Sequence, residues 1–151
     1  MTEVRFYHLT TRSLEDALPT MLERTVERGK RAVVLLASEG RAEELADRLW
    51  RFPENGFLPH GTVKDGYAEA QPIWLTDKDE NPNDASYLFL IDGAESERLA
   101  DYELCSVVFD GRDETAVAAA RARWRRLKDA GHRLIYQKQD ENGRWTAQAE
   151  T

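Results

Sequence analysis

The sequence has one cysteine, three histidines, no long hydrophobic run and fewer basic than acidic side chains. The single cysteine, Cys105, cannot form an internal disulfide, and its apolar neighbours favour a buried, unreactive thiol. None of the histidines has a second metal-ligating residue at a typical zinc spacing, which argues against a metal site. No apolar stretch approaches the roughly 20 residues of a membrane span, and residues 2–12 lack the apolar core of a signal peptide. We therefore expect a cytoplasmic protein without membrane contacts.

Charge and length limit the kinds of partner and the number of domains that the chain can have. The net charge of −7, from 21 basic and 28 acidic side chains, argues against broad, non-specific binding of nucleic acid. A chain of 151 residues is long enough to bury a core without disulfides or metals. We expect a single α/β domain over residues 1–138, followed by a C-terminal tail or edge hairpin over residues 139–151.

Short apolar runs alternate with amphipathic segments along the chain. The runs predict strands over residues 4–9, 31–37, 72–75, 87–91, 105–109 and 134–137. The amphipathic segments predict helices over residues 14–28, 41–52, 94–100 and 114–130. This alternation is typical of an α/β fold with three layers, in which helices flank a mostly parallel sheet. The order of the strands stays open.

Folds of this class often bind nucleotides at the carboxyl ends of their strands. The loops after the first two strands match neither of the glycine-rich phosphate-binding motifs. Asp92-Gly93 and Asp110-Gly111 could hold magnesium, but such pairs are common turns. We therefore expect a nucleotide-binding-like topology without a nucleotide site, a cofactor or catalytic residues. A small nucleotide-binding enzyme with degenerate motifs is the main alternative.

The last long helix carries the densest positive charge. Between residues 121 and 133 there are six basic side chains and one acidic one, in an otherwise acidic chain. On a helical wheel, an arc of about 100° holds a tryptophan among three cations: Arg121, Trp124, Arg125 and Lys128. Guanidinium groups beside an indole suit an acidic peptide that ends in an apolar side chain. The alternative is a solvated helix face whose cations favour the helix C-terminus.

A separate arc of this helix is rich in small residues, and we expect it to pack closely on the sheet. It contains Ala116, Ala119, Ala120, Leu127 and Ala130. Arg123 falls inside this arc and is expected to pair with a buried acid or to extend its head to solvent. A further alternative is direct nucleic-acid binding through this helix. The acidic body and the lack of interleaved aromatic residues argue against it.

A second surface is expected over residues 49–60, where aromatic side chains crowd a proline-containing loop. On such a loop, Trp50 and Phe57 could anchor a protein partner at low entropic cost. The alternative is a loop that folds over the core.

Together, these segments resemble the chi subunit family of bacterial DNA polymerase III. The likeness rests on VRFYHL at residues 4–9, LW at 49–50, FLPH at 57–60 and ARARWRRLKDAG at 120–131. It covers essentially the whole chain in order and spacing. It implies a non-catalytic replisome adaptor without a cofactor, which links single-stranded DNA-binding protein to the clamp loader.

The resemblance also implies two partner surfaces. In such proteins the last helix binds the acidic C-terminal tail of single-stranded DNA-binding protein, which ends in phenylalanine. The matching residues here are Arg121, Trp124, Arg125 and Lys128, with Trp124 in place of a tyrosine. The other surface binds the psi subunit, and its matching residues are Trp50, Phe57 and His60. A helicase can join family members through an overlapping surface, so the partner at Phe57 stays open.

Overall fold

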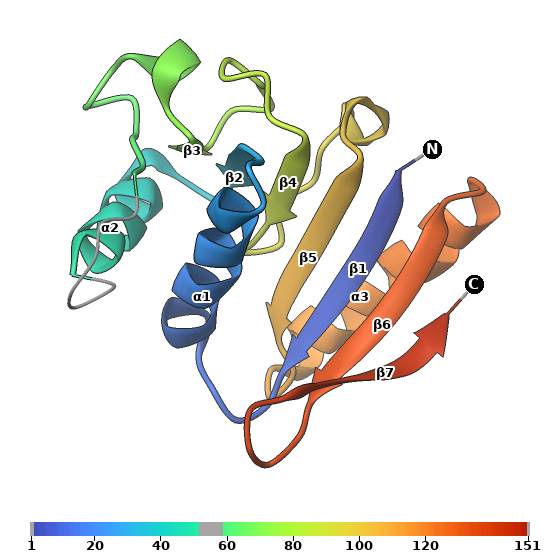
Figure 1. The fold of residues 1–151 in the computed structure, drawn as a ribbon. Coiled ribbons are helices and arrows are strands. Elements are labelled where there is room, and N and C mark those ends of the chain that lie inside the picture. The colour runs from blue at the N-terminus through green and yellow to red at the C-terminus, as the bar shows by residue number, and fades with distance from the viewer. Residues whose placement is uncertain (1, 52–58, 151) are drawn as a thin grey trace.

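The computed structural model describes residues 2–51 and 59–150, which form one seven-stranded sheet with helices on both faces (Figure 1). The strands are β1 (Glu3–Leu9), β2 (Ala32–Leu35), β3 (Ile73–Thr76), β4 (Tyr87–Leu90), β5 (Leu104–Asp110), β6 (Arg133–Gln139) and β7 (Trp145–Glu150). Their order is β3-β2-β4-β5-β1-β6-β7, and all neighbours run parallel except β6 and β7. The predicted α/β fold with a mostly parallel sheet is confirmed. No helix in this part of the chain is long and apolar enough to cross a membrane.

The helices cover the two faces of the sheet unequally. They are α1 (Leu14–Glu27), α2 (Glu39–Trp50) and α3 (Glu114–Asp129). Figure 1 shows α1 and α2 on one face and α3 on the other. Along β2, Val34 belongs to the core under α1 and α2, whereas its neighbour Val33 belongs to the core on the opposite face. On the side of α1, no helix of the described chain lies in front of β1, β6 and β7.

Local sequence signals fix where the helices begin and end. Ser13 caps α1, because its hydroxyl accepts a hydrogen bond from the amide of Asp16 at 3.3 Å. Ser38 caps α2 by accepting from the amide of Arg41 at 3.1 Å, so this helix begins at residue 39 rather than at 41. After α1, Gly29 adopts a φ of 74°, a left-handed conformation that costs glycine little.

The helix predicted over residues 94–100 is wrong. Only Leu99–Asp101 form a single 3₁₀ turn. The carboxylate of Asp79 accepts hydrogen bonds from the hydroxyl of Ser96 at 2.6 Å and from the amide of Glu97 at 2.9 Å. Such side-chain contacts give the backbone an alternative to helical hydrogen bonds. The hydroxyl of Thr2 also donates to the carbonyl oxygen of Leu99 at 3.0 Å, which holds the segment against the N-terminus.

The C-terminal residues of the described chain belong to the sheet. β7 runs antiparallel along β6 and forms one edge of the sheet. Its first residue, Trp145, packs edge-on against Tyr7 with a distance of 5.0 Å between ring centroids. Further inside, Cys105 is fully buried, and burial raises the pKa of its thiol to about 12. That location agrees with the expected unreactive thiol.

Candidate peptide-binding site

Helix α3 packs on β5 and β6 and turns one side toward the sheet. Ala120 and Arg123 are its buried residues, and Trp124 lies half-buried against the same core. The predicted alanine face is only partly right, because Ala119 and Ala130 are exposed. The large indole, rather than a row of alanines, fills part of the space between helix and sheet. Trp124 therefore lies at the border between core and surface.

Three cations surround Trp124 on the outer side of α3. We call these four residues the cationic patch: Arg121, Trp124, Arg125 and Lys128. All three cations are exposed, and within residues 2–51 and 59–150 none of them forms a salt bridge. Their neighbour Arg126 differs, because its guanidinium pairs with the carboxylate of Glu95 at 2.7 Å. The patch thus keeps positive charge that a bound anion could neutralise.

Two aromatic rings hold Trp124 in place. The indole lies edge-on to Phe6, with ring centroids 5.4 Å apart, and edge-on to Tyr136, with ring centroids 5.9 Å apart. These contacts leave the indole partly exposed. The patch therefore combines an ordered apolar wall with unpaired guanidinium groups.

The helical wheel of α3 alone does not show that β6 also contributes side chains beside the cationic patch. Leu134, Tyr136 and Lys138 occupy every second position of β6 and therefore share the face that α3 covers. The hydroxyl oxygen of Tyr136 lies 2.6 Å from Nδ1 of His8. Burial lowers the pKa of His8, and the positive charges of Lys138 and Arg121 lower it further. Burial also raises the pKa of Tyr136, so its phenol stays protonated. The period-two pattern of β6 was the available signal, but it gained meaning only once β6 was known to lie under α3.

Arg123 is a structural arginine, as expected, but its partner was not foreseen. Its guanidinium donates to the carbonyl oxygen of Gly93 at 3.3 Å and lies 3.5 Å from the carboxylate of Glu95. Glu95 is exposed, so the predicted pairing with a buried acid is wrong. Burial lowers the pKa of Arg123, although Glu95 opposes that shift.

The second predicted surface is described only in part. Phe57 and the predicted helix end at residue 52 lie outside the described residues. Trp50 ends α2 with 55% of its surface exposed, whereas His60 is only 4% exposed. The two rings contact each other at 4.5 Å between centroids, and Nε2 of His60 lies 3.0 Å from the carbonyl oxygen of Ala46. His60 therefore supports the indole from within, and Trp50 presents the surface.

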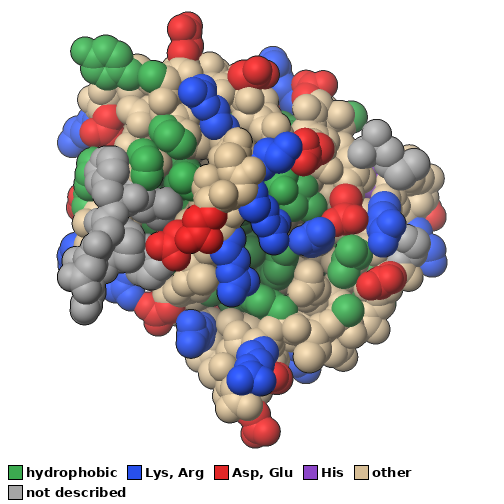
Figure 2. All heavy atoms as spheres, in the orientation of Figure 1, with side chains coloured by type: hydrophobic (Ala, Val, Ile, Leu, Met, Phe, Trp, Pro, Cys, Tyr) green, Lys and Arg blue, Asp and Glu red, His purple; other side chains and the backbone are tan. Residues whose placement is uncertain are grey.

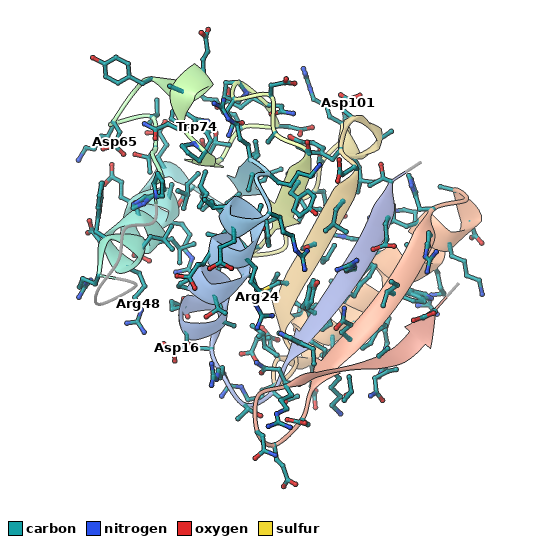
Figure 3. The ribbon with its side chains drawn as sticks, in the orientation of Figure 1. Asp16, Arg24, Arg48, Asp65, Trp74 and Asp101 are labelled. Atoms are coloured by element: carbon teal, nitrogen blue, oxygen red, sulfur yellow. The ribbon has the colours of Figure 1, made fainter. Side chains whose placement is uncertain are left out.

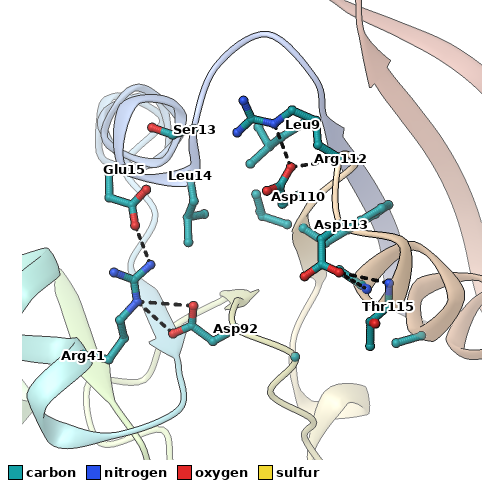
Figure 4. A pocket seen from close by; sticks show the side chains of 15 residues that line it. Leu9, Ser13, Leu14, Glu15, Arg41, Asp92, Asp110, Arg112, Asp113 and Thr115 are labelled. Carbon is teal, nitrogen blue, oxygen red and sulfur yellow. Dashed lines mark hydrogen bonds and ion pairs between the residues drawn. The ribbon is translucent and has the colours of Figure 1, made fainter.

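A cleft of about 500 Å³ opens at the carboxyl ends of β1, β4 and β5, where nucleotides bind in many related folds (Figure 4). We call it the strand-end cleft. Arg41 crosses it, with its guanidinium 2.7 Å from the carboxylate of Glu15 and 3.1 Å from that of Asp92. Burial, the largest single cause, would raise the pKa of Glu15, but the hydrogen bond from Arg41, a backbone hydrogen bond and the charge of Arg41 together lower it. The arginine is thus neutralised by acids of the chain itself.

The other side of the strand-end cleft is also satisfied internally. The carboxylate of Asp113 accepts hydrogen bonds from the amides of Thr115 and Ala116, which fills the N-terminus of α3 (Figure 4). Asp110 accepts from the amide of Arg112 at 2.9 Å, and this bond lowers the pKa of the carboxyl group. A phosphate would therefore meet carboxylates where it needs free amides. No group of three or more metal-ligating side chains occurs in the described residues.

Fold and site together define an α/β protein whose nucleotide-type cleft has its charged groups paired within the chain, and whose helix α3 carries cations without a salt bridge to any described residue. The model of the family "DNA polymerase III chi subunit, HolC" matches residues 1–135, and the chain belongs to this family. A protein of Rickettsia prowazekii (strain Madrid E), named "Probable DNA polymerase III subunit chi", is 31% identical over 91 residues. The matched region is 60% of this chain and 55% of that protein, so the chain spans about half the length of this curated relative.

Proposed function

We propose that this chain is a non-catalytic accessory subunit of DNA polymerase III that binds the acidic C-terminal tail of single-stranded DNA-binding protein. Membership of the chi subunit family supports an accessory role. The observation that carries the proposal is the cationic patch, where exposed cations without salt bridges in the described chain stand beside a half-buried indole. This arrangement suits a short peptide that is acidic and ends in an aromatic residue.

Each residue of the patch has a role in this proposal. Arg121 and Arg125 hold carboxylates of the tail in forked hydrogen bonds, because the guanidinium group matches carboxylate geometry. Lys128 adds a point charge near the end of α3. Trp124, together with Tyr136, provides the apolar wall for the terminal phenylalanine. Because the contact depends on charge, affinity falls as salt is added.

A calorimetric titration with a synthetic tail peptide tests this site. Arg125→Ala and Lys128→Ala are each expected to cost about 1–3 kcal/mol of binding free energy, as for hydrogen bonds between charged groups. The matched control is Arg126→Ala, which removes a cation from the same helix that already pairs with Glu95. The control should bind almost like the parent chain. Unchanged affinity in both patch variants, or an equal loss in the control, contradicts the proposed site.

We further propose that the surface around Trp50 binds the psi subunit or a helicase, with Phe57 and His60 as the other predicted residues. The exposed indole at the end of α2 supports this, because exposed tryptophans are common anchors of protein interfaces. Co-purification with psi should be lost in Trp50→Ala and in Phe57→Ala and kept in Arg125→Ala. A psi complex that survives both aromatic substitutions contradicts this surface.

The non-catalytic part of the proposal has its own test. Thermal unfolding is followed with a panel of nucleotides, each with and without magnesium. Because the charged groups and the α3 amides of the strand-end cleft already have partners within the chain, we expect no shift in Tm. Stabilisation by one nucleotide would instead favour a nucleotide-binding enzyme, because a ligand that binds only the native state raises Tm.

A further inference from the structure

A groove beside α1, on the face of the sheet opposite α3, is lined by arginines and by no acidic side chain. It measures about 200 Å³ and lies over β1, β5 and β6. Its cations are Arg5 from β1, Arg24 from the last turn of α1 (Figure 3) and Arg28, the residue that follows α1, and we call it the arginine groove. Figure 2 shows Lys and Arg side chains gathered over the middle of this face, where α1 meets the uncovered strands. In a chain with a net charge of −7, a groove whose charged lining residues are all cations stands out.

Two of the three guanidinium groups are available to a ligand. Arg24 and Arg28 are exposed, and neither forms a salt bridge or a side-chain hydrogen bond within the described ranges 2–51 and 59–150. They stand four residues apart, Arg24 in the last turn of α1 and Arg28 at its C-cap, a spacing at which like charges repel each other. Arg5 is partly satisfied, because its guanidinium pairs with the carboxylate of Glu3 at 2.6 Å. The groove thus holds repelling cations close together, which a bound anion would relieve.

The floor of the groove is aromatic and polar. Tyr7 and Trp145 meet edge to face at 5.0 Å, and Trp145 remains partly exposed. The side-chain amide of Gln137 lines the groove and makes no hydrogen bond to another described residue. β1, β5 and β6 each pair with a neighbour on both sides, so the floor offers no free backbone groups. An extended peptide could therefore not add to these strands, because β-augmentation needs an open edge.

We propose that the arginine groove binds a short stretch of single-stranded nucleic acid. Arg24 and Arg28, about one helical turn apart, contact neighbouring phosphates. The indole of Trp145 offers a surface for a base, and the Gln137 amide can donate to and accept from a base edge. This ligand needs cations and rings rather than backbone partners, which is what the groove provides. The site is separate from the cationic patch and does not depend on the peptide function proposed for that patch.

Fluorescence anisotropy with the full chain and a labelled oligothymidylate of about 15 nucleotides tests the groove. Binding should be measurable at about 50 mM salt and should weaken with a log–log slope of about −1.4, as expected for the two phosphate contacts of Arg24 and Arg28 on a single strand. Arg24→Ala combined with Arg28→Ala should weaken binding at least about tenfold and remove about 1.4 from the slope. The control pair, Lys64→Ala with Arg98→Ala, removes the same charge from outside the groove and should change affinity less than about twofold.

Four results would overturn the proposal. The first is no binding of the oligonucleotide at low salt, and the second is an equal loss in the control pair. The third is loss of binding in Arg125→Ala, which would place the nucleic acid on α3 instead. A polyglutamate peptide serves as competitor. If it displaces the oligonucleotide at equal charge concentration, the groove is a general acidic-peptide site and the assignment to nucleic acid is wrong.

Discussion

The strand-end cleft and the cationic patch both contain arginines, but these arginines face different surroundings. In the cleft, Arg41 lies between the carboxylates of Glu15 and Asp92, and the amides at the start of α3 are capped by Asp113. On α3, Arg121 and Arg125 have no salt bridge to any described residue. The difference shows that the function of an arginine depends on which groups surround it. Arginines in the cleft should therefore matter for stability, and arginines in the patch for binding.

The largest expected effect is on stability, from a substitution between the strand-end cleft and the cationic patch. A Cβ atom at Gly111 would lie 2.0 Å from the ring of His8 and 2.7 Å from the carbonyl oxygen of Leu9. Gly111→Ala should therefore cost about 3 kcal/mol of unfolding free energy, measured by urea denaturation. His8 would also move away from Tyr136, so the patch should bind its peptide less well.

Gly40→Ala is the matched control for this glycine. A Cβ atom at Gly40 meets only the hydroxyl oxygen of Ser38, at 3.9 Å, in the first turn of α2. Because alanine is the better helix former, the control should be neutral or stabilising by up to about 1 kcal/mol. A Gly111 variant as stable as the control would show that the rim of the cleft can relax.

A smaller loss is expected for Arg41→Ala, about 1–2 kcal/mol, because its ion pairs are only partly buried. The dependence of stability on pH tests this ion pair. The folded-state pKa of Glu15 lies below its usual 4.5, so the carboxylate contributes stability above pH 4.5 that is lost as pH falls through the folded pKa. Arg41→Ala should weaken this acid-side loss. Urea unfolding of both proteins between neutral and acidic pH measures it, and parallel curves would contradict the pairing.

The cations of the patch should have almost no effect on folding. Arg121 and Arg125 are four residues apart and repel each other, so Arg121→Ala should stabilise α3 by about 0.2–0.5 kcal/mol. The same change should weaken binding of the tail peptide to the cationic patch. A substitution that costs more than about 1 kcal/mol of stability would mean that the patch is structural, and the contrast with the cleft would fail.

The smallest change is a shift in one titration. The pKa of His8 lies below 6.5 because of burial and because of the charges of Lys138 and Arg121. Arg121→Ala should raise this pKa, and so should a bound acidic peptide, because both reduce the positive charge near the ring. NMR titration of the His8 ring measures the shift. A peptide that binds without moving the His8 titration binds elsewhere.

Sequence reasoning reached the parts of the molecule that local chemistry determines. The buried β2 and the position of the cationic arc on α3 follow from patterns within one element. The failures involve contacts between distant segments. Asp79 prevents a helix at Ser96, and this pairing joins residues 17 positions apart.

The same limit applies to the candidate site. Tyr136 and His8 meet beside the patch although they are 128 positions apart in sequence. Nothing in the spacing of β6 alone predicts that Tyr136 and Lys138 complete a site on α3. The arginine groove was missed for the same reason, because β1 and α1 form it together only after the sheet has assembled.

The strand order gives the molecule a fixed span. α2 packs beside β3, and α3 packs on the far face over β5, three positions away in the sheet. With strands about 4.8 Å apart and layers about 10 Å apart, the two helices are separated by on the order of 25 Å. Two partners bound at the surfaces proposed on α2 and α3 would each meet the other at an effective concentration in the millimolar range. Such coupling needs no change of shape, so a rigid sheet can bring two assemblies together simply by acting as a spacer.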